Sequence, residues 1–281
     1  MALGAALPLT AIALAGCGGG GGDDELVHGP GVELAARLPS DDALNIAIAD
    51  VTAIRKHLDM KPHSIPPTDD DGADLAFLDE IGAALGIVST GTFPQPIVDA
   101  ALRRAGWIAG VAGDQGVTAI SIGGNGAGLR SMLAEAGLQE EDGEWVQEDG
   151  DYAIALGDGL IVFADDPGDA KPVIEDDPDD VPDQLAALDG DGDLITLARF
   201  GADCVEAVGT ADTPGEDGEV AFFTTATPDP DKITSDSDEI GKGRVVGDSA
   251  RAQVAAAADP AGEPPALRAV QQFDVHYDCD A

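Results

Sequence analysis

The chain has 281 residues, with 14 Lys and Arg against 54 Asp and Glu, a formal net charge of −40 and an apolar fraction of 44%. This length and apolar content allow one large or two small folded domains. The basic residues form no long run, although Arg103-Arg104 is a doublet. The sequence therefore argues against a nucleic-acid partner, since binding to phosphates needs clustered cations. The excess of acid fits either adaptation to high salt or the solubility of an exported protein.

The chain begins with an apolar segment that ends at a cysteine. Residues 2–16 carry no charge and are too few for a membrane span of about 20 apolar residues. An uncharged segment of this length is typical of the apolar region of a signal peptide. The segment ends in Leu14-Ala15-Gly16-Cys17, and this tetrapeptide resembles the lipobox of bacterial lipoproteins. The resemblance implies that Cys17 carries a diacylglyceryl group and becomes the N-terminus after cleavage. The alternative is a core helix with a buried cysteine, which Pro8 and the five glycines at 18–22 disfavour.

These features predict how the chain is divided. We expect a signal peptide over residues 1–16, a lipidated Cys17 with a flexible acidic tether over 17–37, and a folded domain over 38–281 with a sub-boundary near 176–192. A two-chain lipid holds a protein stably on a membrane. The expected location is therefore the extracytoplasmic side of the cell membrane, with the membrane itself as the partner through the lipid on Cys17.

Apolar periodicity and turn residues predict alternating strands and helices in the rest of the chain. In chain order they are a strand at 45–49, helices at 74–85 and 96–105, strands at 107–111 and 117–122, a helix at 129–136, strands from 145, at 152–156 and at 160–164, helices at 170–175 and 182–188, strands at 194–198 and 220–225, a helix at 249–257 and a strand at 272–277. The spacing is not that of regular βαβ units. It favours an α+β fold with a mainly antiparallel sheet and several packed helices. The similarity of NIAIAD at Asn45 to LITLAR at Leu194 suggests two similar halves.

Two stretches also resemble a known family. The turn and strand LPSDDALNIAIAD at Leu38–Asp50, and the strand, helix and hairpin over Val117–Val173, are similar to an uncharacterised family of exported proteins in high-GC Gram-positive bacteria. That family is a domain of unknown function. The resemblance implies an architecture and an extracytoplasmic location, but no chemistry.

Two cysteines remain once Cys17 is assigned to the lipid. An even number in an exported protein predicts a disulfide between Cys204 and Cys279, although two separate thiols are the alternative. Such a bridge would fasten the C-terminal end of the chain to the folded part.

An acidic motif over residues 189–193 invites comparison with a calcium loop. Asp189, Asp191 and Asp193 match its first three acidic positions, but Leu194 stands where the loop needs glycine and Phe200 where it needs glutamate. A turn before the strand at 194–198 is the better interpretation, and calcium binding is the alternative.

A serine hydrolase is a second alternative function. Ser121 lies between a strand and a helix, as in a nucleophile elbow, and His276 is the histidine that follows it in the chain order of the hydrolase triad. The simpler interpretation is that both residues lie on ordinary strands.

A glycine-rich loop at 123–128 precedes the helix at 129–136, where it matches a helix cap better than a phosphate-binding motif. The histidines have no paired spacing typical of a metal site. We therefore expect no cofactor and no metal, and the leading hypothesis is a non-enzymatic lipoprotein that serves as a binding or structural module.

Overall fold

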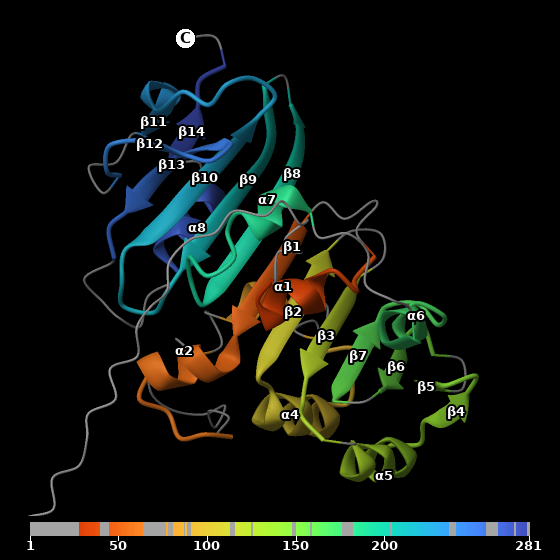
Figure 1. Ribbon diagram of the computed structural model, residues 1–281. Coiled ribbons are helices and arrows are strands. Elements are labelled where there is room, and N and C mark those ends of the chain that lie inside the picture. The colour runs from red at the N-terminus through yellow and green to blue at the C-terminus, as the bar shows by residue number, and fades with distance from the viewer. Residues whose placement is uncertain are drawn as a thin grey trace, which may run out of the picture.

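A twelve-stranded sheet runs through the structure and carries helices on both faces (Figure 1). The computed structural model describes residues 28–39, 45–63, 77, 81–86, 88, 91–112, 116–124, 126–147, 150–157, 159–175, 182–202, 204–235, 240–256, 264–272 and 274–279. The predicted α+β class with an antiparallel sheet is confirmed, because all neighbouring strands of this sheet pair antiparallel. Within these described ranges, no helix has the length and apolar character that a membrane crossing requires.

The strand order divides the sheet into two halves that meet at β1 and β8. From this seam outward, the first half holds β1 (Asn45–Asp50), β2 (Trp107–Ala112), β3 (Val117–Ser121), β7 (Leu160–Ala164), β6 (Ala153–Leu156), β5 (Glu144–Val146) and β4 (Gln139–Glu141). The second half holds β8 (Leu194–Ala202), β9 (Val205–Asp212), β10 (Gly218–Thr224), β13 (Ser249–Val254) and β12 (Arg244–Val246). Each half begins with a three-stranded meander, and the last strand of the half, β7 or β13, lies beside the third strand of that meander. Four strands, β4 to β7, follow the meander in the first half, whereas the second half adds the hairpin of β12 and β13.

The register at the seam is that of a two-fold axis. The pairs run from Asn45↔Ala198 to Ala49↔Leu194, so the axis passes through the middle pair, Ala47↔Thr196. When NIAIAD is aligned with LITLAR, Asn45 corresponds to Leu194 and Ala49 corresponds to Ala198. A rotation about this axis therefore exchanges the outer pairs Asn45↔Ala198 and Ala49↔Leu194. The two halves are therefore similar in strand order and symmetric in register, as the sequence suggested.

Alternating side chains along the strands build a core on each face of the sheet. In β1, Ile46 and Ile48 belong to one core cluster, whereas Ala47 and Ala49 belong to the cluster on the other face. The face of Ile46 is covered by α1 (Pro30–Ala35), α6 (Ala170–Glu175) and α7 (Asp183–Ala186). The opposite face is covered in the first half by α2 (Val51–His57), the helical residues 81–85, α4 (Gln95–Arg104) and α5 (Ala127–Glu135). In the second half it is covered by the 3₁₀ helix η2 (Pro230–Lys232), α8 (Pro265–Gln271) and a small sheet of β11 (Ile233–Ser235) and β14 (Val275–Tyr277).

Helix α1 lies inside the segment 17–37 that the sequence assigned to a tether. Its residues Val32, Leu34 and Ala35 are buried in the core. Gly31 permits the close approach to the sheet, since a Cβ there would lie 2.4 Å from the ring of Trp107. The folded part therefore begins before residue 38. The second predicted boundary is the one near residues 176–192. There, α6 closes the first half at Glu175, and α7 opens the second half at Asp183.

The helix predicted over residues 249–257 is wrong, because residues 249–254 form strand β13. Its alanines favour a helix in isolation. In the sheet, however, Ala250 and Ala252 are fully buried and alternate with Ser249 and Arg251, whose side chains bond to each other. Tertiary packing therefore overrides the local preference. Strands β4, β9, β11 and β12 and helices α1, α2 and α8 have no counterpart among the predicted elements.

A buried carboxylate fastens α8 to the sheet of the second half. Asp212, only 1% exposed, accepts hydrogen bonds from the backbone N–H groups of Ala266 (2.7 Å) and Leu267 (3.1 Å) at the start of α8. Burial raises the pKa of Asp212 to about 6, although the two N–H donors act in the opposite direction. The group thus binds a proton more tightly in the folded chain than its ordinary value of 3.8 would allow.

This difference predicts a pH dependence of stability. Between about pH 4 and about pH 6 the folded state holds a proton that the unfolded chain has released, so the contribution of Asp212 to the free energy of unfolding falls as pH rises. The full fall is about 3 kcal/mol. We expect Asp212→Asn to remove it, which urea unfolding of both proteins at pH 4.5 and 7.5 would measure. Parallel pH profiles for the wild type and the variant would contradict the assignment.

Candidate functional site

The two residues of the hydrolase alternative lie in different halves of the protein. The Oγ of Ser121, at the end of β3, accepts a hydrogen bond from the backbone N–H of Trp107 (2.9 Å). His276 lies in β14. The next residue, Tyr277, packs against Phe222 of β10 with 5.7 Å between the ring centroids. Strands β3 and β10 are separated by four other strands, or about 24 Å across the sheet. The structure does not bring Ser121 and His276 together, and it lends the hydrolase alternative no support.

The three carboxylates of the calcium alternative each have a different partner. Asp189 accepts a hydrogen bond from the backbone N–H of Gly29 (2.6 Å), just before α1. Asp191 pairs with Arg251 of β13 (2.6 Å), and Asp193 bonds Nδ1 of His57 at the end of α2 (2.6 Å). Each carboxylate therefore ties a different segment of the chain to the residues just before β8. The three carboxylates do not share a common site. No group of three or more His, Cys, Asp or Glu residues suited to a metal occurs in the part of the chain that the structure describes.

The predicted disulfide is confirmed by the geometry of its cysteines. Cys204 and Cys279 are bonded, with 5.8 Å between their Cα atoms and a sequence separation of 75. Both lie in the second half, where the bridge links the turn between β8 and β9 to the residues after β14. The predicted lipid site, Cys17, lies outside the described residues.

A pocket of about 510 Å³ lies in the first half, between α2, the residues 58–63 that follow it and the C-terminal end of α4. Its charged lining residues are Arg55, Lys56, Asp59, His63 and Arg104, and we call it the cationic pocket. Three permanently cationic groups face one carboxylate in its wall. Among the described residues, no ion pair joins Lys56 or Arg104 to an acidic side chain.

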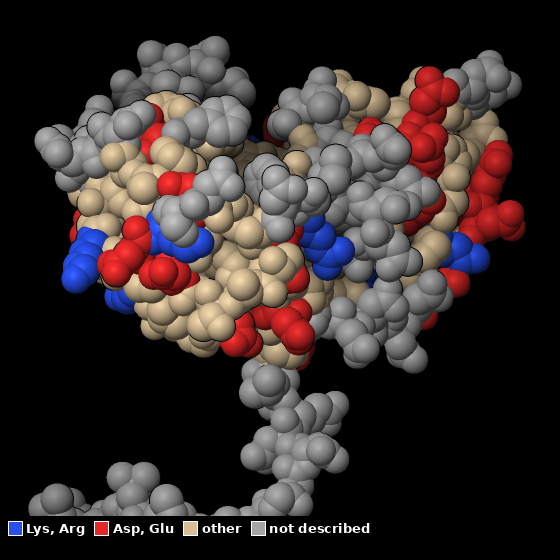
Figure 2. All heavy atoms as spheres, turned by 90° about the horizontal axis from the view of Figure 1, so that it is seen from above, with Lys and Arg blue, Asp and Glu red and all other residues tan. Residues whose placement is uncertain are grey.

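This local charge is opposite to that of the whole chain. Five of the chain's 14 Lys and Arg residues lie in α2, in residues 58–63 or at the end of α4, namely Arg55, Lys56, Lys61, Arg103 and Arg104. The face shown in Figure 2, seen from above the molecule of Figure 1, instead carries several groups of acidic side chains and few basic ones. The cationic pocket lies at the opposite end of the strands, where α2 and α4 are found at the bottom of Figure 1.

Arg55 builds the floor of the cationic pocket. Its side chain is buried and donates to the backbone carbonyls of Leu102 and Ala105 (2.9 Å to Ala105), which are acceptors left over at the end of α4. Its guanidinium also lies over the ring of Phe77, 5.4 Å from the centroid. Burial lowers the pKa of Arg55, and its Nε has no hydrogen-bond partner. One donor of a buried cation in the pocket wall is therefore unsatisfied.

The residues that follow α2 are held in an uncommon backbone conformation. Asp59 and His63 have φ values of +53° and +61°, in the left-handed region that Asp and His tolerate better than most residues. His63 is fixed by a hydrogen bond from its Nδ1 to the backbone carbonyl of Arg103 (2.9 Å). Backbone strain of this kind is found disproportionately at functional sites. The hydrogen bond to Arg103 holds His63 next to the end of α4, beside the cationic pocket.

One signal for this pocket is present in the sequence itself. Arg55-Lys56 is a second basic doublet, 48 residues before Arg103-Arg104. Sequence separation hides their proximity. The antiparallel pairing of β1 with β2 places the start of α2 next to the end of α4, since Val51 follows β1 and Ala105 precedes β2.

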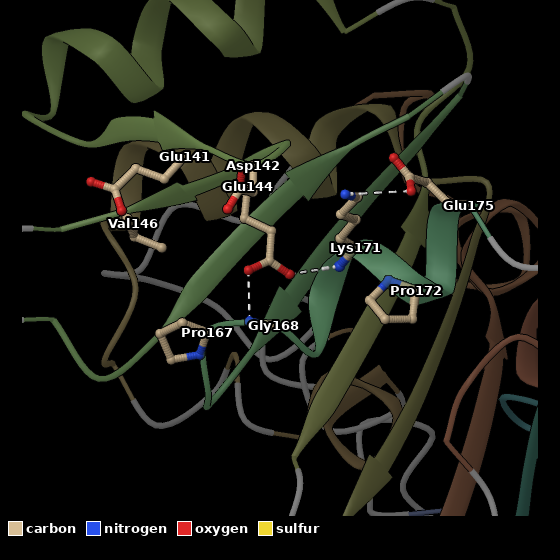
Figure 3. Close-up of a pocket in the computed structure, with 9 residues that line it drawn as sticks. All are labelled: Glu141, Asp142, Glu144, Val146, Pro167, Gly168, Lys171, Pro172 and Glu175. Atoms are coloured by element: carbon tan, nitrogen blue, oxygen red, sulfur yellow. Dashed lines mark hydrogen bonds and ion pairs between the residues drawn. The ribbon is translucent and has the colours of Figure 1, made fainter.

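A second pocket, of about 450 Å³, lies between the edge hairpin of β4 and β5 and helix α6 (Figure 3). Its most buried charged residue, Glu144, accepts hydrogen bonds from the backbone N–H groups of Gly168 and Lys171, both 2.7 Å long. Lys171 in turn pairs with Glu175 on the next turn of α6 (3.6 Å). Both oxygens of Glu144 thus hold the start of α6, so we take the cationic pocket as the candidate functional site.

No family model matches the chain, and no curated protein matches it. A solved structure titled "Structure of crystal form I of TP0453" is similar over 79% of this chain and 91% of that chain, with 8% sequence identity and a TM-score of 0.48. A likeness at this level carries no argument about function.

Proposed function

We propose that this protein is a lipid-anchored, extracytoplasmic binding module. The observation that carries the proposal is the tetrapeptide Leu14-Ala15-Gly16-Cys17, at the end of a charge-free segment and followed by five glycines. A lipid on Cys17 would hold the folded part near the membrane surface, with the residues between Cys17 and α1 as the tether. The disulfide between Cys204 and Cys279 is in keeping with an oxidising compartment outside the cytoplasm.

The cationic pocket supports the binding role. Its volume, about 510 Å³, falls in the range of small-molecule sites, and it combines charged groups with the apolar side chains of Met60 and Ala105. Among its described lining residues, no hydrogen bond joins a nucleophile to a base. The resemblance to an exported family of unknown function points to the same location without naming a ligand.

The anchor predicts the fate of a single substitution. In a bacterial host that acylates lipoproteins, we expect Cys17→Ser to move the protein from the membrane fraction into the soluble exported fraction, because the thioether cannot form on a serine. Gly20→Ser adds the same side chain to the glycine segment without removing the thiol, and it should leave the protein membrane-bound. Intact-mass measurement of the membrane fraction gives a direct reading. The expected product begins at an acylated Cys17, and an unmodified chain that begins at Met1 would refute the anchor.

A further inference from the structure

The exposed groups of the cationic pocket are donors suited to an oxyanion. Lys56 and Arg104 both line the pocket, one from the last turn of α2 and the other from the last turn of α4, and the guanidinium group of Arg104 lies beside Gly128 near the start of α5. Both side chains belong to exposed residues, and among the described lining residues the cations outnumber the one carboxylate, that of Asp59. Charge-assisted hydrogen bonds from such groups to an anion are stronger than neutral ones. A negatively charged group is therefore the ligand that this wall can recognise.

The ring of His63 favours a phosphate ligand over a carboxylate ligand. A carbonyl oxygen can only accept, so Nδ1 of His63 carries the hydrogen that it donates to Arg103. The other ring nitrogen, Nε2, is then an acceptor in the neutral ring and a donor in the charged ring. A phosphate monoester near neutral pH can offer either a P–OH donor or a P–O⁻ acceptor, because its second proton is partly bound. A carboxylate offers only the acceptor, so phosphate matches His63 in both of its states.

The remaining features suit a phosphate that is carried on a small body. The pocket has more room than a bare phosphate fills, and Met60, Pro62 and Ala105 give it an apolar side. Beneath it, the Nε of the buried Arg55 still lacks an acceptor. A buried donor without a partner calls for an explanation, although this nitrogen has no surface open to the pocket.

We propose that the cationic pocket binds a phosphate group through Lys56, Arg104 and His63, with the group that bears the phosphate lying against Met60 and Pro62. This inference deepens the binding role proposed above and rests on it, but it does not depend on the lipid anchor. The phosphate has two sources, a small soluble phosphoester or the headgroup of an anionic phospholipid in the membrane nearby. Both present phosphate oxygens to Lys56 and Arg104, whereas only a phosphate monoester also offers a P–OH donor to His63.

Titration calorimetry of the full chain in detergent tests the soluble source, with phenyl phosphate and benzoate as probes. We expect phenyl phosphate to bind at least tenfold more tightly than benzoate. Lys56→Gln and Arg104→Gln should each weaken its binding about fivefold, since each removes one charge-assisted contact that is partly exposed to water. Lys242→Gln makes the same change of net charge on the exposed β12 end of the sheet and should leave the affinity unchanged.

Flotation with vesicles tests the lipid source. The Cys17→Ser chain is used so that no acyl group contributes, and vesicles of phosphatidylcholine alone are compared with vesicles that contain phosphatidylglycerol. Selective binding to the anionic vesicles that is lost in the Lys56→Gln, Arg104→Gln double variant supports a headgroup. Binding of phenyl phosphate without vesicle selectivity supports a soluble phosphoester. Unchanged melting temperatures for the variants would confirm that they fold.

The outcomes separate this inference from the broader proposal. If phenyl phosphate and anionic vesicles both fail to bind, or if the double variant binds them as the wild type does, the phosphate inference is overturned. If benzoate binds as tightly as phenyl phosphate and the variants weaken both equally, the pocket is a binding site but not one for phosphate. A chain that binds phenyl phosphate but carries no lipid on Cys17 would refute the anchor alone.

Discussion

Replacing Arg251 with methionine is expected to lower the free energy of unfolding by about 3 to 5 kcal/mol, the cost of removing one partner of a buried ion pair. The Arg251 side chain is 4% exposed and lies 2.6 Å from Asp191 and 2.8 Å from Glu219. It also donates to the backbone carbonyl of Ala187 (2.7 Å), and so ties β13 to the residues between α7 and β8. Without it, Glu219, whose side chain is 12% exposed, keeps only its pairing with the more exposed Arg244.

Urea unfolding of Arg251→Met and Asp191→Asn would measure this effect and its asymmetry. The side chain of Asp191 is 40% exposed, so its loss should cost less than about 1 kcal/mol, which is usual for a solvated ion pair. Equal losses for the two variants would contradict the buried role of Arg251. The same samples test the calcium alternative, because a bound ion must raise the melting temperature of the native state. We expect none of the proteins to respond to Ca²⁺.

The double substitution Cys204→Ser, Cys279→Ser is expected to destabilise the protein by about 4 kcal/mol, the chain-entropy estimate for a loop of this length. The bridge closes 75 residues, from the turn after β8 to the end of β14. Besides the bridge, strand β14 is held by its three-residue pairing with β11, by the buried side chain of Val275 and by the contacts of Tyr277. Freeing the bridge should therefore loosen β14 and the contact of Tyr277 with Phe222 first.

Chemical denaturation of the double variant, and of the wild type with and without reductant, would measure this contribution. The reduced wild type and the double variant should unfold at the same denaturant concentration, well below that of the oxidised protein. The cationic pocket lies in the other half and gives a control, because phenyl phosphate should bind equally to the oxidised protein and to the folded double variant. A reduced protein as stable as the oxidised one would contradict the prediction.

The sequence predicted the elements that depend on local signals. The hairpin of β6 and β7 follows from apolar runs on either side of a glycine turn, and Gly159 has the left-handed φ, +80°, that such a turn uses. Helix α5 follows from its apolar stripe, of which Leu129 and Leu133 are fully buried. The pairing of Cys204 with Cys279 followed from cysteine number and compartment alone.

The sequence could not predict features that arise from contacts between distant segments. Strand β13 reads locally as a helix and becomes a strand because β10 and β12 pair with it on either side. The cationic pocket is a similar case, because Arg55 and Arg104 meet only when β1 pairs with β2. Asp189, Asp191 and Asp193 are adjacent in sequence, yet their partners lie on three different elements. Motif spacing says nothing of such partners.

The seam at β1 and β8 has a consequence for how this protein could have arisen. A chain with only one half would leave its first strand as an open edge, and two copies could join there about the axis through Ala47 and Thr196. In such a homodimer every site occurs twice. In the joined chain the halves are free to diverge, and here the first carries the cationic pocket while the second carries the disulfide.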